Sequence, residues 1–494
     1  MDVPAERRHL HPFARGPVLG ATFAVIVVLT VASVGYGYDR DELYFRMLRP
    51  AWGYVDQPFL TPLIVHGTAQ LVDTVWAIRF PGTLFVAASV VVVALLTREL
   101  GGDRTAQTLA AWGYGFAAMP LALGHVALTA TFDLPFWPAI AWAIVRAQLR
   151  DRPRWWLVAG LLVGTDLLDK VLVVVLLAAV LLGIVVAGPR ALLRSRWVWG
   201  GVLVALVVGS PTIAYQLANG LPQLDVGAAL AADNGGDVRI QMWWFLGLIL
   251  GPPLTVIWLS GLVALWRRRA WRPVRFLAAA FPFLLVGVFA MGSQLYYPLG
   301  LVAVLFAAGC PPTVDWWRRG RGAGRRTFVV AWVALNVVVS SVIALPVIPV
   351  DVVGSTPVAG INQLVGDSIG WPAYVRQIRG VVEGLPAADR GRAVVVTSNY
   401  GEAGAVSRYA PDLHVDSGQN ALWDQDRPDD TATVVVYVGE QYESARAWFG
   451  SCAVATTLEN GVDVDNEEQG VPVAVCRDPV GGWSRVWPQV RHLD

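Results

Sequence analysis

The sequence predicts a polytopic α-helical membrane protein of about eleven spans, followed by a C-terminal extracytoplasmic α/β domain. Hydrophobic residues make up 55% of the 494 residues and charged residues only 15%, against roughly 25% charged residues in soluble domains. The apolar residues are gathered in runs that reach the roughly 20 residues needed to cross a bilayer. Arg-rich and acidic segments alternate between these runs, as cytoplasmic and external loops do.

The spans follow one another with short loops. The basic N-terminal residues Arg7, Arg8 and Arg15 place the N-terminus in the cytoplasm, and the first apolar run is too long for a cleaved signal peptide. Residues 35–74 therefore form the first external loop. In chain order the spans are expected at about 17–36, 75–97, 105–123, from Asp133 to Arg146, outward from Trp155, inward to Arg190, 197–218, 242–266, up to Gly292, 297–312 and 327–347.

The composition changes after Pro349, which divides a membrane domain (1–349) from a soluble domain (350–494). Residues 393–398 and 432–439 are short, strongly apolar runs that indicate buried strands, and a helix is expected in the stretch WPAYVRQIRGVVEGL. An oxidising exterior would permit a bridge between Cys452 and Cys476, but the sequence leaves the required geometry open.

Loop 35–74 has more charges than its position between apolar spans would suggest. It contains three clustered carboxylates, three arginines and many aromatic side chains, and short surface helices are expected at 40–48 and 60–73. One interpretation is a solvated loop anchored by interfacial aromatics. The other is an active site at the membrane surface. The carboxylates are Asp39, Asp41 and Glu42, and the arginines are Arg40, Arg46 and Arg49.

Further ionisable residues lie at external span ends, namely Asp133, Asp166, Asp169 and the only lysine, Lys170. Such groups near a membrane are usually functional, although Asp133 is also suited to cap the next helix and Lys170 to snorkel. A transporter would place these groups nearer mid-span. An enzyme acting on a lipid-linked substrate needs a carboxylate base and cations at one wet face. The absence of a long basic tract argues against nucleic acid as a partner.

Several segments, in this order, resemble the GT-C glycosyltransferases. YDRDELYFRMLR and AWGYVDQPFLTPL are similar to the first external loop of the dolichyl-phosphate-mannose–protein mannosyltransferase and lipid A aminoarabinose transferase branch. TATFDLPFWPAIAW, LLVGTDLLDKVLVVVLL and SQLYYPLGLVAVLFAAG resemble later segments of that branch, and SNYGEAGA and GVDVDNEEQG resemble the exterior tail of an actinobacterial subgroup. The resemblance covers nearly the whole chain and implies a GT-C fold.

The resemblance implies an inverting transfer of a sugar from a polyprenyl phosphate to a protein, lipid or glycan acceptor outside the cytoplasmic membrane. Asp41 matches the general base, Glu42 its acidic neighbour and Asp133 the second acidic position. The donor phosphate and sugar would be bound by residues drawn from Arg40, Arg46, Lys170, Tyr296 and Tyr297.

No metal-ligand motif is present, although paired carboxylates leave a divalent cation open. Gln57 stands where the aminoarabinose enzymes have a phosphate-binding lysine, and it is followed by Pro58 and Phe59 rather than by a proline pair. Asp39 and Asp169 receive no function from the resemblance. The alternatives are a glycolipid flippase or exporter and a non-catalytic scaffold that presents the C-terminal domain. The sugar, the acceptor, the function of the C-terminal domain and the oligomeric state stay open.

Overall fold

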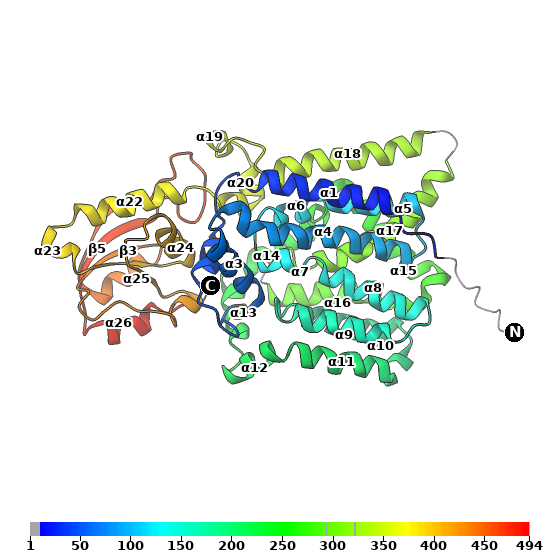
Figure 1. Ribbon diagram of the computed structural model, residues 1–494, viewed down its shortest axis with the longest axis horizontal. Coiled ribbons are helices and arrows are strands. Elements are labelled where there is room, and N and C mark those ends of the chain that lie inside the picture. Colours follow the sequence, from blue (N-terminus) through cyan, green and yellow to red (C-terminus); the bar gives the residue numbers. More distant parts are fainter. Residues whose placement is uncertain (1–9, 293, 321–322, 494) are drawn as a thin grey trace.

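The structure, a computed structural model, describes residues 10–292, 294–320 and 323–493. Arg7 and Arg8, on which part of the predicted orientation rests, lie outside these residues. Roughly parallel helices form a long bundle, and a smaller α/β part adjoins one end of it (Figure 1). The described N-terminal residues lie at the opposite end of the bundle.

The bundle is built from apolar helices at the positions of the predicted spans and from short helices between them. In chain order they are α1 (Arg15–Ala32), α4 (Val75–Glu99), α5 (Arg104–Gly115), α6 (Ala118–Gly124), α7 (Thr129–Asp133), α8 (Phe136–Leu149), α9 (Trp155–Asp166), α10 (Val173–Ala187), η1 (Arg190–Arg194), α11 (Arg196–Val208), α12 (Ser210–Ala218), α13 (Pro222–Asp233), α14 (Gly235–Leu248), α15 (Pro252–Arg267), η2 (Arg269–Val274), α16 (Phe276–Met291), α17 (Leu299–Arg318) and α18 (Gly324–Ala344).

The polytopic helical fold is confirmed, and the count of about eleven spans stays a prediction. Within the described residues, α1, α4, α17 and α18 are each long and apolar enough to cross a membrane. The number rises to six if the bent pairs α11–α12 (63°) and α14–α15 (92°) each count as one span. The other expected spans coincide with helices of at most 16 residues or with the broken pair α5–α6. Proline and glycine interrupt several of them, and hydropathy alone does not register such breaks.

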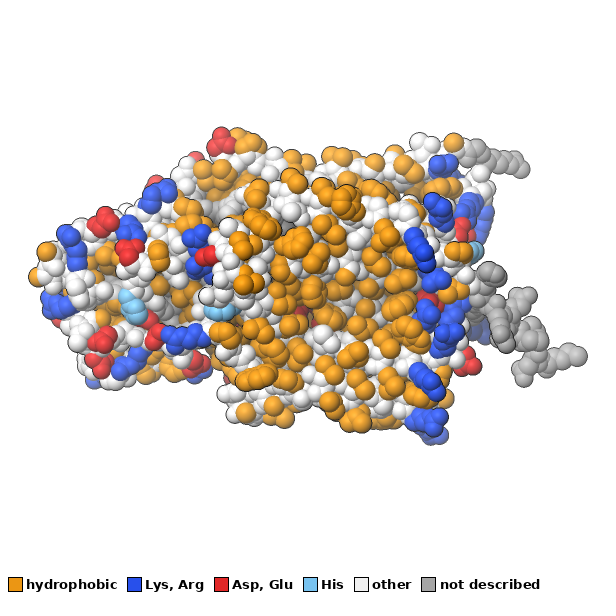
Figure 2. Space-filling model, in the orientation of Figure 1, with side chains coloured by type: hydrophobic (Ala, Val, Ile, Leu, Met, Phe, Trp, Pro, Cys, Tyr) orange, Lys and Arg blue, Asp and Glu red, His pale blue; other side chains and the backbone are white. Residues whose placement is uncertain are grey.

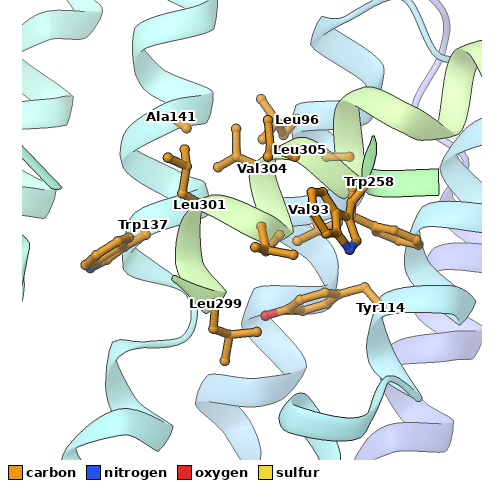
Figure 3. Close-up of a cluster of buried hydrophobic side chains, with 14 of the residues drawn as sticks. Val93, Leu96, Tyr114, Trp137, Ala141, Trp258, Leu299, Leu301, Val304 and Leu305 are labelled. Carbon is orange, nitrogen blue, oxygen red and sulfur yellow. The ribbon is translucent and has the colours of Figure 1, made fainter. Parts of the chain in front are cut away.

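Close helix packing holds the bundle together. Its core gathers side chains from α4, α5, α8, α15 and α17 (Figure 3). Glycines let backbones approach, as is typical of membrane helices: a Cβ on Gly261 would lie only 1.8 Å from the carbonyl oxygen of Leu305, and one on Gly160 only 2.0 Å from that of Gly201. Larger residues at these positions would force α15 from α17 and α9 from α11.

Loop 35–74 forms two short helices, as predicted. They are α2 (Arg40–Met47) and α3 (Leu60–Leu71). Both lie at the end of the bundle that faces the α/β part (Figure 1). Side chains of the loop share one apolar core with the α/β part, so the two pack as a continuous unit.

The α/β part is built around a five-stranded mixed sheet. Its strand order is β2-β1-β3-β5-β4, with β2, β1 and β3 parallel and β5 antiparallel to both of its neighbours. The two strands predicted from apolar runs are β1 and β3, and the predicted helix is α22. The strands are β1 (Ala393–Thr397), β2 (Val415–Ser417), β3 (Val434–Val438), β4 (Phe449–Thr457) and β5 (Pro472–Pro479).

Helices and a disulfide complete this part. Cys452 and Cys476 are paired across β4 and β5 and form a disulfide. The helices from Val350 onward are α19 (Val350–Val353), α20 (Val358–Ile361), α21 (Gln363–Gly366), α22 (Trp371–Gly384), α23 (Ala387–Arg390), α24 (Tyr400–Tyr409), η3 (Asn420–Leu422), α25 (Tyr442–Ala445), η4 (Arg446–Trp448) and α26 (Trp483–Val490). The exact boundary after Pro349 stays a prediction.

The charges are distributed asymmetrically along the long axis. Figure 2 shows lysine and arginine side chains gathered at the end of the bundle away from the α/β part, with a broad hydrophobic surface between. At that end Glu99 is buried and binds Arg146 (2.6 Å) and Arg150 (2.9 Å).

Candidate active site

The first turn of α2 presents the central carboxylate. Asp39 caps the helix by accepting a hydrogen bond from the Asp41 backbone N–H (2.9 Å), while Glu42 accepts one from the Asp39 N–H (2.9 Å). This reciprocal arrangement satisfies backbone donors that a helix start otherwise leaves open. It gives Asp39 a structural function, and it leaves the Asp41 side chain half-buried between two fully buried carboxylates.

Glu42 lies in a fully buried ion pair. Both Arg79 and Glu42 are 0% exposed, and the Arg79 guanidinium donates to both Glu42 oxygens at 2.8 and 3.0 Å. Glu42 also accepts from the Ala127 N–H at 2.8 Å. Because these donors occupy the carboxylate, Glu42 anchors α2 to α4 rather than facing the space around Asp41.

Tyr400, the first residue of α24, donates a hydrogen bond from its hydroxyl to Asp41 Oδ1 at 2.8 Å. The Arg40 guanidinium lies 4.8 Å above the centre of the Tyr400 ring. Burial raises the pKa of Asp41, whereas Arg40 and the Tyr400 hydroxyl lower it. The net effect is a raised pKa of Asp41, which is the direction that favours a general base.

Asp56 is a second titratable carboxyl close to Asp41. Burial raises its pKa to about 7, and the negative charge of Asp41 adds to the increase, while the Tyr44 hydroxyl acts against it. Gln57, the residue that departs from the family pattern, is buried and contacts Asp56 at 3.3 Å.

Lys170 lies in the turn between α9 and α10, on the same side as Asp41. The two charges are close enough to interact electrostatically. The Lys170 ammonium is 3.4 Å from the Tyr296 hydroxyl and lies 5.0 and 5.4 Å from the ring centres of Tyr296 and Tyr297. Lys170 is therefore held by protein partners and does not simply snorkel toward water.

Asp133 ends the short helix α7 and does not cap α8, whose N-cap is Pro135. It interacts with Asp166, Trp137 and Lys170 instead. Asp169, for which the sequence suggested no function, accepts a hydrogen bond from the Thr61 hydroxyl and so ties α3 to the turn that carries Lys170. The predicted residues Asp41, Asp133, Lys170, Tyr296 and Tyr297 are thus brought into one neighbourhood.

The two arginines predicted to bind a donor are engaged elsewhere. Arg46 donates to both oxygens of Asp73, at 2.7 to 3.0 Å, and Arg40 forms an ion pair with Glu467. In the part of the chain that the structure describes, Lys170 is the cation near Asp41 that has no carboxylate at ion-pair distance.

The residues present do not fit a multidentate metal site. Nowhere in residues 10–292, 294–320 and 323–493 do three or more His, Cys, Asp or Glu side chains converge as metal ligands. Asp133 and Asp166 interact electrostatically with the Lys170 ammonium, which already supplies positive charge.

Three residues of this neighbourhood were not singled out from the sequence. Arg79 is one, hidden within an apolar run, and Tyr400 and Glu467 come from the C-terminal part of the chain. The pattern Asn399–Glu402 is a capping box and signals where α24 begins. Nothing in the sequence signals that Tyr400 meets a carboxylate 359 positions away.

Comparison with known proteins supports the predicted fold class. The family described as dolichyl-phosphate-mannose-protein mannosyltransferase matches residues 56–215, which include Asp133 and Lys170 and begin beyond Asp41. No protein of curated function matches the sequence.

Solved structures share the fold at low sequence identity. ArnT from Cupriavidus metallidurans bound to undecaprenyl phosphate superposes with a TM-score of 0.56 and 15% identity, over 92% of this chain and 97% of ArnT. Its apo form gives 0.53 and 14% over the same shares. Arabinofuranosyltransferase AftD from Mycobacteria gives 0.51 and 12% over 93% of this chain and 40% of AftD. Over residues 56–215 the chain is thus similar to the mannosyltransferase family, and over nearly its whole length it shares the fold of ArnT.

Proposed function

We propose that the protein transfers a sugar from a polyprenyl-phosphate donor to an acceptor hydroxyl, with inversion at the anomeric carbon and Asp41 as general base. The observation that carries this proposal is that Asp41, which accepts a hydrogen bond from Tyr400, and Lys170 are close enough to interact electrostatically. Such a displacement requires a base that takes the acceptor proton and a cation that stabilises the leaving phosphate, with the reacting carbon between them.

In the proposed reaction the acceptor O–H gives its proton to Asp41 as its oxygen forms a bond to the anomeric carbon. The bond between that carbon and the phosphate oxygen breaks, and the polyprenyl phosphate leaves with the electron pair. Lys170, with the Tyr296 and Tyr297 hydroxyls around it, is placed to stabilise the leaving phosphate. ArnT, which shares the fold, binds undecaprenyl phosphate, a lipid of the class proposed here.

The other predicted residues take supporting functions in this proposal. Asp133, with Asp166, orients the Lys170 ammonium, and Glu42 fixes the helix that carries Asp41. Arg40 acts on Asp41 through its charge and through the Tyr400 ring. Arg46 is assigned to the Asp73 ion pair rather than to the donor.

We further propose that the protein lies in the cytoplasmic membrane with its α/β part outside. The basic end of the bundle, opposite that part, then faces the cytoplasm, as the positive-inside tendency expects (Figure 2). The Cys452–Cys476 disulfide suits an oxidising compartment.

The test is Asp41→Asn, which keeps the shape of the side chain but removes the base. Purified protein in nanodiscs is incubated with a panel of labelled undecaprenyl-phosphate sugars and a membrane extract as acceptor. We expect transfer to fall at least a hundredfold, which is the scale of general-base catalysis. Asp426→Asn is the matched control, because Asp426 pairs with exposed Arg49 at the same junction. Wild-type rates in Asp41→Asn would refute the assignment.

Asp41→Asn also distinguishes a glycosyltransferase from a flippase. A flippase needs no general base, so Asp41→Asn protein in proteoliposomes would still translocate an undecaprenyl-phosphate sugar. Transport that survives the substitution, without any transfer by the wild type, would favour the flippase. Mass spectrometry of surface glycans from a deletion strain would identify the acceptor.

A further inference from the structure

Helix α24 of the C-terminal part packs unusually closely on α2. A Cβ added to Gly404 would lie 2.7 Å from the Leu43 backbone, and one added to Gly401 would lie 3.0 Å from the Arg40 Cβ. Glycine at both positions therefore allows the backbone of α24 to reach the helix that carries Asp41. This approach brings the first residue of α24 into the candidate site.

Tyr400 is held rigidly at this point. Asn399 and Glu402 close a capping box around the start of α24, and the Tyr400 backbone N–H donates to Gln419 Oε1 at 2.6 Å. Its ring stacks on Tyr44 at 4.5 Å, with the Arg40 guanidinium on the ring at 4.8 Å. The direction of the hydroxyl is thus fixed by groups other than Asp41 itself.

The two oxygens of Asp41 differ in their surroundings. Oδ1 accepts the Tyr400 hydroxyl proton at 2.8 Å. Oδ2 accepts no hydrogen bond from the described residues. It is also not one of the fully buried side-chain oxygens that lack a partner. One oxygen is therefore fixed by the protein, while the other faces accessible space.

We propose that Tyr400 is a positioning residue supplied by the C-terminal domain, which holds Asp41 Oδ1 so that Oδ2 takes the proton of the acceptor. This inference rests on the proposed function and extends it, because it makes the α/β part a component of the active site. The domain would then act on catalysis through a single hydroxyl as well as through any contact with acceptor.

The charged and titratable groups that act on Asp41 come from every element packed around it. Removing the Tyr400 hydroxyl leaves all of the others in place, so the effect of one hydrogen bond is isolated. These groups are Asp39, Arg40, Glu42, Asp56, Lys170, Asp367 and Tyr400.

The experiment is Tyr400→Phe, which removes the hydroxyl and keeps the ring on Tyr44 and beneath Arg40. Loss of a hydrogen bond to a charged carboxylate is expected to lower kcat roughly tenfold to a hundredfold at neutral pH, with KM for the undecaprenyl-phosphate sugar changed less than about threefold. Because the hydroxyl lowers the pKa of Asp41, its removal raises that pKa. The acidic limb of the kcat profile should then move up by about one pH unit.

Tyr374→Phe is the matched control, since it also removes a buried hydroxyl of the C-terminal part, one bound to Asn466 at 2.8 Å. It should leave the acidic limb in place. A second readout needs no turnover: infrared titration of the Asp41 carboxyl, taken as the difference between wild type and Asp41→Asn, should show the same upward shift in Tyr400→Phe.

The inference about Tyr400 would be overturned if Tyr400→Phe changed neither the acidic limb of the kcat profile nor the infrared titration of the Asp41 carboxyl. Asp41 would then remain the proposed base. Absence of transfer by the wild type from every donor in the panel would overturn the proposed function and with it the catalytic role of Tyr400. The infrared titration would then still decide whether Tyr400 holds Asp41.

Discussion

The buried pair of Arg79 and Glu42 makes a quantitative prediction about stability. Arg79→Met keeps the apolar stem of the side chain and removes the guanidinium. Glu42 then retains only its backbone donors, the N–H groups of Asp39 and Ala127. The carbonyl oxygens of Ser33 and Gly37, which Arg79 binds at 2.9 and 2.6 Å, also lose their donor.

The size of the effect follows from burial. Both partners are 0% exposed, so removal of one leaves an uncompensated charge away from water, at a cost of about 3–5 kcal/mol. Exposed pairs contribute about 0–1 kcal/mol. Arg49 and Asp426 form such a pair, with side chains 65% and 60% exposed, and Arg49→Met is therefore the matched control.

The assay is unfolding in detergent followed by tryptophan fluorescence, completed as a double-mutant cycle with Glu42→Gln. The double variant Arg79→Met/Glu42→Gln removes the stranded charge and should recover at least about half of the loss, since neutralising the partner removes the larger part of the penalty. The reasoning is refuted if Arg79→Met costs no more than Arg49→Met, or if the double variant is no more stable than Arg79→Met alone.

The remaining predictions concern the donor, the pH dependence and the disulfide. Lys170→Met should weaken undecaprenyl phosphate binding by roughly tenfold or more, because a phosphate loses its cationic partner. Arg46→Gln should change that binding less than about threefold. Native mass spectrometry measures both affinities, and equal losses in the two variants would contradict the assignment of Lys170 to the donor phosphate. Glu402 has a pKa raised to about 8 by burial, above its unfolded value near 4.5. Its folded form thus binds an extra proton between these values, so wild-type stability should fall as pH rises from 5 to 8, and the unfolding midpoint of Glu402→Gln should fall less. Cys452→Ser should lower the free energy of unfolding by about 2–4 kcal/mol under oxidising conditions. Addition of reductant should cause no further loss of stability in this variant.

Local features of the fold were readable from the sequence because they depend on neighbours in the chain. The helices in loop 35–74 begin and end within two residues of the predicted positions, and the apolar runs after Ala393 and Ala432 form strands β1 and β3 as expected. The number of spans stays a prediction, because hydropathy records how apolar a segment is, whereas breaks such as the 92° bend between α14 and α15 depend on packing.

The candidate site, like the fold, was predicted from the sequence only in part. The sequence contains a chemically consistent set of residues, and the structure gathers them: Asp41, Asp133, Lys170, Tyr296 and Tyr297. Arg46 and Glu42 look equally available in the sequence. Only their tertiary partners, Asp73 and Arg79, show that these charges are already engaged.

The sequence by itself determined that this is a helical membrane protein with a terminal α/β part, and it predicted that acidic and aromatic residues gather at one membrane face. Those properties follow from hydropathy and short-range pattern. Tertiary structure decided which carboxylate stays half-exposed, which cation stays without a carboxylate partner, and that Tyr400 reaches Asp41 from the far end of the chain. Such contacts arise when distant segments pack together, and no local pattern encodes them.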